Sequence, residues 1–104
     1  MGKLLVFVKE PMHKAKHVWV SFSQDNLEKV LEGKPVAYPF STDEQILAAD
    51  DMIEGNKYYN CTLLGQQFFG TIIICGKDES GNAASSTMDI KTFKRLFPEL
   101  MREE

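Results

Sequence analysis

Apolar positions in the first quarter of this chain fall into two short runs that are typical of β-strands. Residues 3–10 (KLLVFVKE) are rich in Val, Leu and Phe, and the run stops at Pro11, which has no N–H to donate to a strand ladder. Residues 17–22 (HVWVSF) alternate, with Val18, Val20 and Phe22 on one face. We predict two strands that pair as a hairpin.

Two segments show the spacing of amphipathic helices. In residues 23–35, Ser23 is suited to cap the first turn and the stripe Leu27, Val30 and Leu31 follows helical spacing. Gly33 is the expected left-handed residue that ends this helix. The second helix is predicted within residues 87–100, with Ile90, Phe93, Leu96 and Phe97 on its apolar face.

The segment between the helices predicts further strands. Residues 36–40 indicate an edge strand because Pro39 interrupts them. Residues 41–50 are ambiguous: Ser41 and Glu44 match a helix capping box, whereas the short apolar run 46–48 suits a buried strand. We favour the strand, because the run is too short for a helix.

The most apolar stretch lies between Tyr58 and Gly81 and reads as a strand, a turn and a central strand. Residues 67–76 (QFFGTIIICG) form a near-continuous apolar run, as in a strand covered on both faces. Gly70 within that run indicates a bulge or a close backbone contact.

These elements predict an α+β fold: a single domain over residues 1–104, with a small, mainly antiparallel sheet and two helices packed on one face. The order of elements is β-β-α-β-β-β-α. The predicted core consists of Leu5, Phe7, Val20, Leu27, Val30, Leu31, Phe69, Ile72, Ile74, Phe93 and Leu96.

The chain carries a net charge of −3, and its acidic residues gather in the middle. Residues 35–56 contain no Lys or Arg. A nucleic-acid-binding protein usually shows the opposite bias, so we expect a basic protein partner and no direct contact with nucleic acid. The candidate partner-binding residues are the acidic residues and two tyrosines: Asp43, Glu44, Asp50, Asp51, Glu54, Tyr58 and Tyr59. The tyrosines serve as anchors only if they are exposed, and core or partial burial is the commoner fate of such a residue.

No membrane span is expected, because every apolar run is far shorter than the roughly 20 residues of a membrane helix. The start MGKLLVFVKEP is too short and too soon charged for a secretion signal. The expected location is the cytoplasm, where Cys61 and Cys75 are reduced thiols. The two cysteines lack metal-ligand spacing, and His13 and His17 straddle a turn and a strand. We therefore expect no metal, no cofactor and no enzymatic activity.

Several pieces in their order resemble the domain of unknown function 3846 family, small proteins of phages and conjugative elements. The pieces are the opening strand that ends in Glu10-Pro11, the helix NLEKVLEGK, Asn60 before a short turn, FFGTIIICGKDESG, and the closing helix that ends in LFPEL. The chain is also similar in size and composition to small type II-A anti-CRISPR proteins that inhibit Cas9. The resemblance implies an accessory protein that binds and inhibits a host defence nuclease, blocking nucleic-acid loading on a Cas9-type effector. An alternative is a nucleotide-binding protein that uses Trp19, Tyr58 and Tyr59 as a stacking wall.

Overall fold

The structure is a computed structural model that describes residues 2–41, 43–51, 55 and 57–101. Its strands are β1 (Lys3–Lys9), β2 (Lys16–Ser21), β3 (Pro35–Pro39), β4 (Glu44–Ala49), β5 (Tyr59–Leu63), β6 (Gln66–Phe69), β7 (Ile72–Lys77) and β8 (Ala83–Ala84). Its helices are α1 (Gln24–Leu31), α2 (Ile90–Leu96) and the short 3₁₀ helix η1 (Pro98–Met101).

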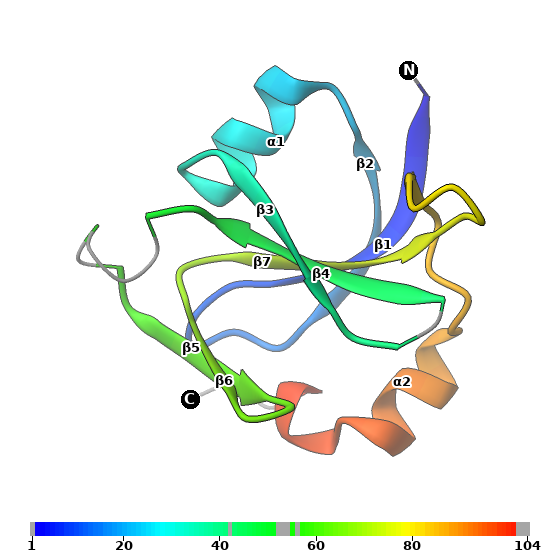
Figure 1. Cartoon of the computed structure of the whole chain (residues 1–104). Coiled ribbons are helices and arrows are strands. Elements are labelled where there is room, and N and C mark those ends of the chain that lie inside the picture. The colour runs from blue at the N-terminus through cyan, green and yellow to red at the C-terminus, as the bar shows by residue number, and fades with distance from the viewer. Residues whose placement is uncertain (1, 42, 52–54, 56, 102–104) are drawn as a thin grey trace.

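The main sheet has the strand order β2-β1-β7-β4-β3, and every pair in it is antiparallel (Figure 1). β8 pairs with β7, while β5 and β6 form a separate two-stranded sheet. The β1–β2 hairpin and the edge position of β3 are confirmed. The predicted α+β class is confirmed as well, since two helices accompany an antiparallel sheet.

One face of the sheet is covered by α2. Phe7, Ile74 and Ile46 lie opposite one another on β1, β7 and β4, so their side chains share that face. Phe93 of α2 stacks on Phe7, with ring centroids 4.0 Å apart.

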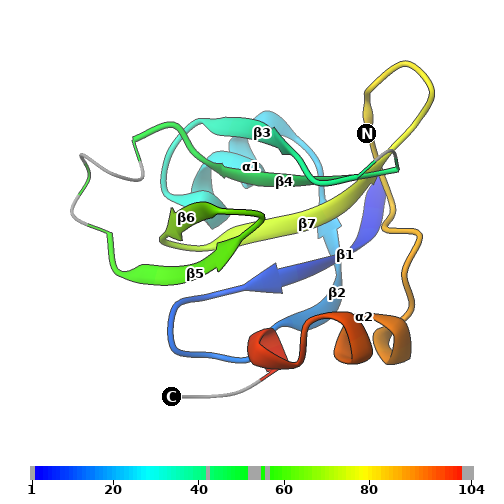
Figure 2. The same ribbon diagram turned by 60° about the horizontal axis from the view of Figure 1, so that its bottom comes forward.

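The other face is covered by α1, which packs beside β3 and β4. Gly33, just after α1, approaches Ala49, whose side chain alternates to the face opposite Ile46. The two helices therefore lie on opposite faces instead of sharing one (Figure 2). The physical reason is visible in β1, where the consecutive residues Val6 and Phe7 are both fully buried, so both faces of the sheet need an apolar cover.

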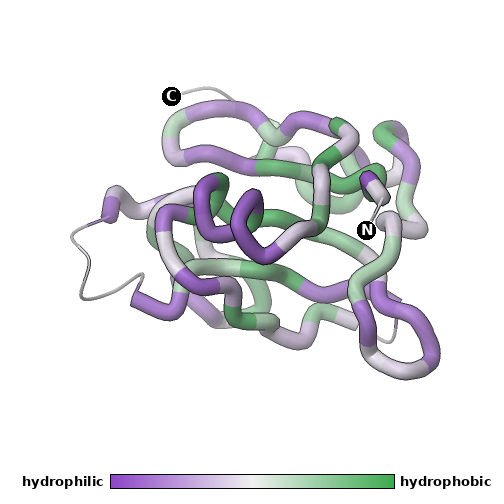
Figure 3. Tube along the Cα trace, turned by 90° about the horizontal axis from the view of Figure 1, so that it is seen from above, coloured by the Kyte–Doolittle hydropathy of each residue, from purple (hydrophilic) through white to green (hydrophobic). Residues whose placement is uncertain are grey.

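Helix α1 begins as predicted and ends one residue earlier than predicted. The Ser23 hydroxyl accepts a hydrogen bond from the Asn26 N–H at 3.2 Å. The left-handed residue is Glu32, with φ of 57°, and not Gly33. Gly33 is instead required by space, because an added Cβ would lie 2.8 Å from the Ala49 Cβ. In Figure 3 the strands beneath α1 are traced mainly as hydrophobic, while the helix itself is largely hydrophilic.

The predicted strand 67–76 is two strands in different sheets. Gly70 has φ of 80° and turns the chain between β6 and β7. This break shifts the alternation, so that Phe68 is buried while Phe69 is only half-buried. The prediction of Phe69 as a core residue was therefore wrong by one position, because Phe68 is the buried residue.

Residues 44–49 form β4, so the predicted strand is confirmed and the alternative helix is not formed. The whole strand is buried. The capping-box interpretation of Ser41 and Glu44 was wrong, because Glu44 begins a strand.

Most of the predicted core is buried around one cluster that includes Phe7, Leu31, Ile74 and Phe93. Leu5 and Val30 are half-buried, and Leu96 is 55% exposed. Leu96 is the last residue of α2, and Leu100 of η1 enters the core instead.

Among the residues that the structure describes, no helix is both long enough and apolar enough to cross a membrane.

Candidate functional site

The ends of β4 and β5 bring four of the predicted partner-binding residues into one region of the fold, referred to below as the β4–β5 surface. Asp50 and Asp51 follow β4 directly, and Tyr58 and Tyr59 stand at the start of β5. All four are exposed, with Tyr58 at 74% and Tyr59 at 50%. The surface therefore groups two exposed carboxylates with Tyr58, whereas the neighbouring Tyr59 lines a different cavity with Glu99 and Leu100.

Lysines flank this surface, although the segment 35–56 itself contains none. The Lys57 Nζ lies 3.2 Å from the Asp51 Oδ1 and forms an ion pair with it. On the other side, the Asp50 N–H donates to the Lys34 carbonyl at 2.8 Å, so the two backbones are adjacent there. The ion pair with Lys57 reduces the negative potential at Asp51 that the sequence alone predicts.

The two tyrosines have different surroundings. Tyr59 packs edge-on against Phe69, with ring centroids 5.7 Å apart, and its hydroxyl is 2.6 Å from that of Thr62. Tyr58 lines a cavity of about 380 Å³ together with His13 and Lys57. Tyr58 is the more exposed ring and is the better placed of the two to contact another molecule.

The remaining predicted residues do not belong to the β4–β5 surface. Asp43 precedes β4 at its other end, about 20 Å away along a six-residue strand, and lines a hollow with Asp78 and Glu79. Glu44 is only 3% exposed, so its prediction as a partner-binding residue is corrected: its carboxylate binds Ser86 and Thr87 within the protein. Glu54 lies outside the described residues.

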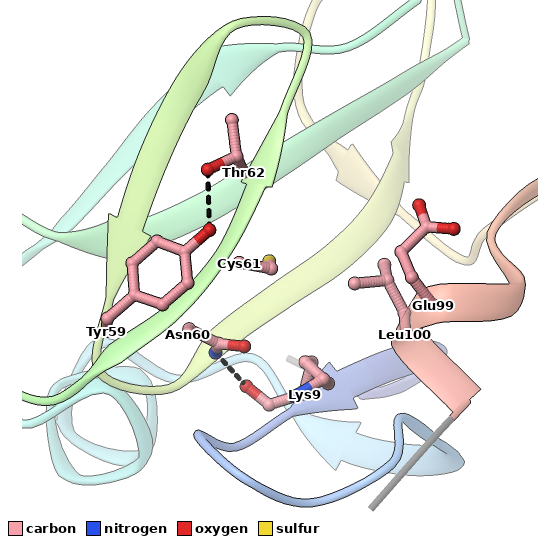
Figure 4. Close-up of a pocket in the computed structure, with 7 residues that line it drawn as sticks. All are labelled: Lys9, Tyr59, Asn60, Cys61, Thr62, Glu99 and Leu100. Atoms are coloured by element: carbon pink, nitrogen blue, oxygen red, sulfur yellow. Dashed lines mark hydrogen bonds between the residues drawn. The ribbon is translucent and has the colours of Figure 1, made fainter. Parts of the chain in front are cut away.

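A second cavity, of about 240 Å³, lies between β5, the end of β1 and η1 (Figure 4). The side chain of Asn60 forms one side of it, and its Nδ2 donates to the carbonyls of Lys9 and Gly70, each at 2.7 Å. Its Oδ1 is buried and has no hydrogen-bond partner among the described residues. Sequence reasoning noted Asn60 only as a residue before a turn and gave no role to Lys9, which is buried.

Cys61 points into this second cavity from β5, with Glu99 and Leu100 across from it (Figure 4). Burial raises the pKa of the Cys61 thiol to about 11, while Lys9 lowers it and Glu99 raises it further. Burial likewise raises the pKa of Cys75 to about 11, against a hydrogen bond from Gln45 that lowers it. Both thiols are protonated at neutral pH and are weak nucleophiles.

The two histidines do not form a metal site with each other. His17 stacks flat on Phe7, with ring centroids 4.3 Å apart, and its Nε2 is buried without a hydrogen-bond partner in the described part of the chain. His13 lies in the turn before β2 and lines the cavity beside Tyr58. The described residues contain no group of three or more His, Cys, Asp or Glu side chains that could hold a metal ion.

No protein-family model, no curated protein and no solved structure matches this chain.

Proposed function

We propose that this protein is a non-catalytic binding protein whose β4–β5 surface contacts a basic region of another protein. The observation that carries the proposal is the exposure of Asp50, Asp51 and Tyr58 in one region of the fold, with the exposed Tyr59 next to them in sequence. Carboxylates at an interface steer association with a basic partner, and tyrosines supply contact area at small entropic cost. The raised pKa of both thiols is also in keeping with a non-catalytic role.

The partner that we propose is a Cas9-type nuclease, and the protein would be an accessory of a phage or other mobile genetic element. This part rests on the resemblance to the domain of unknown function 3846 family and to type II-A anti-CRISPR proteins. It agrees with the physics of the target, because such nucleases hold guide RNA and DNA in positively charged channels. An acidic surface seated in such a channel would block nucleic-acid loading.

The test measures DNA cleavage by a purified Cas9-type nuclease that is mixed with the protein before or after guide RNA is added. Inhibition is expected when the protein is added first, because loading is the step that it blocks. The variant Asp50→Lys/Asp51→Lys should lose this inhibition. A matched control, Asp43→Lys/Glu79→Lys, makes the same change in net charge at exposed positions outside the β4–β5 surface and should keep it. Full cleavage in the presence of wild-type protein, in either order of addition, would overturn the nuclease as partner.

A nucleotide-binding function is the second candidate, and the cavity beside Tyr58 favours it. An aromatic ring next to Lys57 and His13 could stack on a base and attract a phosphate. Trp19 lines neither cavity that contains a tyrosine, so the three aromatic residues do not form one stacking wall. Mass spectrometry of small molecules released from the denatured, freshly purified protein separates the two candidates: a stoichiometric nucleotide would support this one, and its absence would support the protein-binding function.

A further inference from the structure

The two edges of the main sheet differ in how they are protected. β3 carries Pro35 and Pro39, and proline is a common device that keeps an edge strand from pairing with another chain. β2 contains no proline, its one charged residue is Lys16 at its start, and in the described part of the chain no strand pairs with its outer side. An open edge of this kind is a template for a further strand.

Hydrogen bonds of β1 reveal which groups of β2 face outward. The Leu5 N–H donates to the Ser85 Oγ, and the Leu5 carbonyl accepts from the Ser86 N–H, each at 2.9 Å. Both backbone groups of Leu5 thus point away from β2. In an antiparallel ladder its partner Trp19 must then point its own N–H and C=O outward, and so must His17 and Ser21, two positions to either side.

The part of the β2 edge that is open to a partner strand begins after Ala15. The Ala15 N–H, which follows the same outward alternation, donates to the Leu100 carbonyl at 2.7 Å. Helix η1 therefore closes the edge immediately before β2. The Asn26 Nδ2 donates to the Ser21 carbonyl at 2.8 Å, so the start of α1 limits the edge at its other end. The N–H and C=O of His17 and Trp19 and the N–H of Ser21 remain for a partner strand.

We propose that β2 is a self-association edge, at which a second copy of this chain adds its own β2 in antiparallel orientation. The two-fold axis passes through Trp19, so that Trp19 pairs with Trp19 of the second copy. His17 then pairs with Ser21 of the second copy, and the same pair recurs on the other side of the axis. In this register every outward residue of β2 meets an outward residue, which joins two sheets into one continuous antiparallel sheet.

Side chains on both faces of β2 complement a second copy. Trp19 is the only tryptophan of the sequence and is 62% exposed, so pairing across the axis would bring two exposed indoles together on one face. On the opposite face, the exposed Lys16, whose Nζ lies 3.9 Å from the Glu10 Oε1, would lie near the start of α1 of the second copy, where Asp25 is exposed. Because one six-residue strand forms the contact, the dimer is expected to be weak and concentration-dependent.

The first experiment measures molar mass by sedimentation velocity from micromolar to millimolar protein concentration. The wild type should change from monomer to dimer within this range. Trp19→Lys places two ammonium groups side by side and should weaken the dimer at least about tenfold. Tyr58→Lys introduces the same charge at an exposed tyrosine away from β2 and should leave the dimer unchanged. A wild type that stays monomeric throughout, or equal dimerisation by Trp19→Lys, would overturn the proposal.

The second experiment tests the register. Paired residues at this type of position have Cα atoms about 5.5 Å apart, which suits a disulfide. Trp19→Cys should therefore form a disulfide-linked dimer under mild oxidation. Ser21→Cys should not, because the two copies of position 21 would be offset by four residues, or roughly 13 Å. The native Cys61 and Cys75 are buried and present in all samples, so the wild type gives the baseline. No crosslink in Trp19→Cys, or an equal one in Ser21→Cys, would exclude this arrangement.

Discussion

The Glu44 carboxylate accepts a hydrogen bond from the Ser86 hydroxyl at 2.5 Å, across 42 positions of sequence. Its other oxygen accepts from the Thr87 N–H at 2.9 Å and from the Thr87 hydroxyl at 3.2 Å. These bonds attach the segment that leads into α2 to the first residue of β4. A side chain that sequence reasoning assigned to a partner surface is in this way part of the internal structure.

Glu44→Ala is expected to lower the free energy of unfolding by about 2–3 kcal/mol, because three donors would lose a charged acceptor in a buried region. Urea unfolding measures the change. Asp43→Ala is the control: it removes an exposed carboxylate at the neighbouring position and should change stability by at most about 0.5 kcal/mol. Equal stability of the two variants would contradict the structural role of Glu44.

Truncation of a buried side chain should cost more stability than truncation of an exposed one. Leu31→Ala and Ile74→Ala are each expected to cost about 2–5 kcal/mol, since both side chains are almost completely buried. Leu96→Ala, at a position that sequence periodicity also assigned to the core, should cost less than about 1 kcal/mol because Leu96 is largely exposed. A loss at Leu96 as large as that at Leu31 would contradict the described end of α2.

Local patterns were sufficient for several elements of this fold. Ser23 as N-cap, the apolar stripe of α1 and the short run in β4 each carried enough information within a few residues. Contacts between residues far apart in the sequence could not be predicted from such patterns. Ser41 and Glu44 match a capping box locally, and only the fold brings Ser86 to Glu44.

The break between β6 and β7 and the ion pair of Asp51 also depend on the fold and could not be predicted from local sequence patterns. A glycine within an apolar run is compatible with a bulge or with a chain reversal, and only the φ of Gly70 decides that β6 and β7 belong to different sheets. For the candidate site, exposure of Asp50 and Asp51 could be anticipated from their charge and turn context, whereas local sequence favoured burial of the tyrosines, which are exposed in the fold. The ion pair from Lys57 to Asp51 depends on how the intervening segment folds back, which composition does not reveal.

Gly76→Ala is predicted to be strongly destabilising, by about 1–3 kcal/mol or more. An added Cβ would overlap the backbone oxygen of Ser85 and approach the Glu44 Oε2 to 3.2 Å, so the segment that these residues hold in place would have to move. Gly2→Ala serves as the control, because nothing lies within 4 Å of an added Cβ there. Thermal unfolding of both variants is the measurement, and identical melting temperatures would contradict the close packing at Gly76.

The buried thiols predict a loss of stability at alkaline pH. Their pKa is raised from 9.0 to about 11 in the folded protein, mainly by burial, so deprotonation is easier in the unfolded chain. Their contribution to stability is therefore complete below about pH 9 and is lost as the pH rises to about 11. Unfolding by urea at several pH values should show a shallower alkaline decline in Cys61→Ser/Cys75→Ser than in the wild type. Parallel curves would contradict the raised pKa values.

The same cysteines should be dispensable for binding. Cys61→Ser and Cys75→Ser are each expected to keep the inhibition proposed above, while Cys75→Ser loses about 1–3 kcal/mol of stability because a hydroxyl replaces a thiol in a fully buried strand. The nuclease assay and urea unfolding are carried out on the same preparations. Complete loss of inhibition by either soluble, folded variant would instead indicate thiol chemistry.

Charge reversal on the β4–β5 surface is expected to act on the rate of association with the partner. Exposed charges attract a basic surface over a distance of roughly 8–10 Å at physiological salt, so Asp50→Lys/Asp51→Lys should slow association and weaken its dependence on salt. Asp51 already pairs with Lys57, so Asp50→Lys alone should produce more of this effect than Asp51→Lys alone. Association kinetics at two salt concentrations measure both effects, with Asp43→Lys/Glu79→Lys as the control for net charge. If the double variant associates as fast as the wild type at both concentrations, then charge on this surface has no part in recognition, and Tyr58 becomes the residue to test.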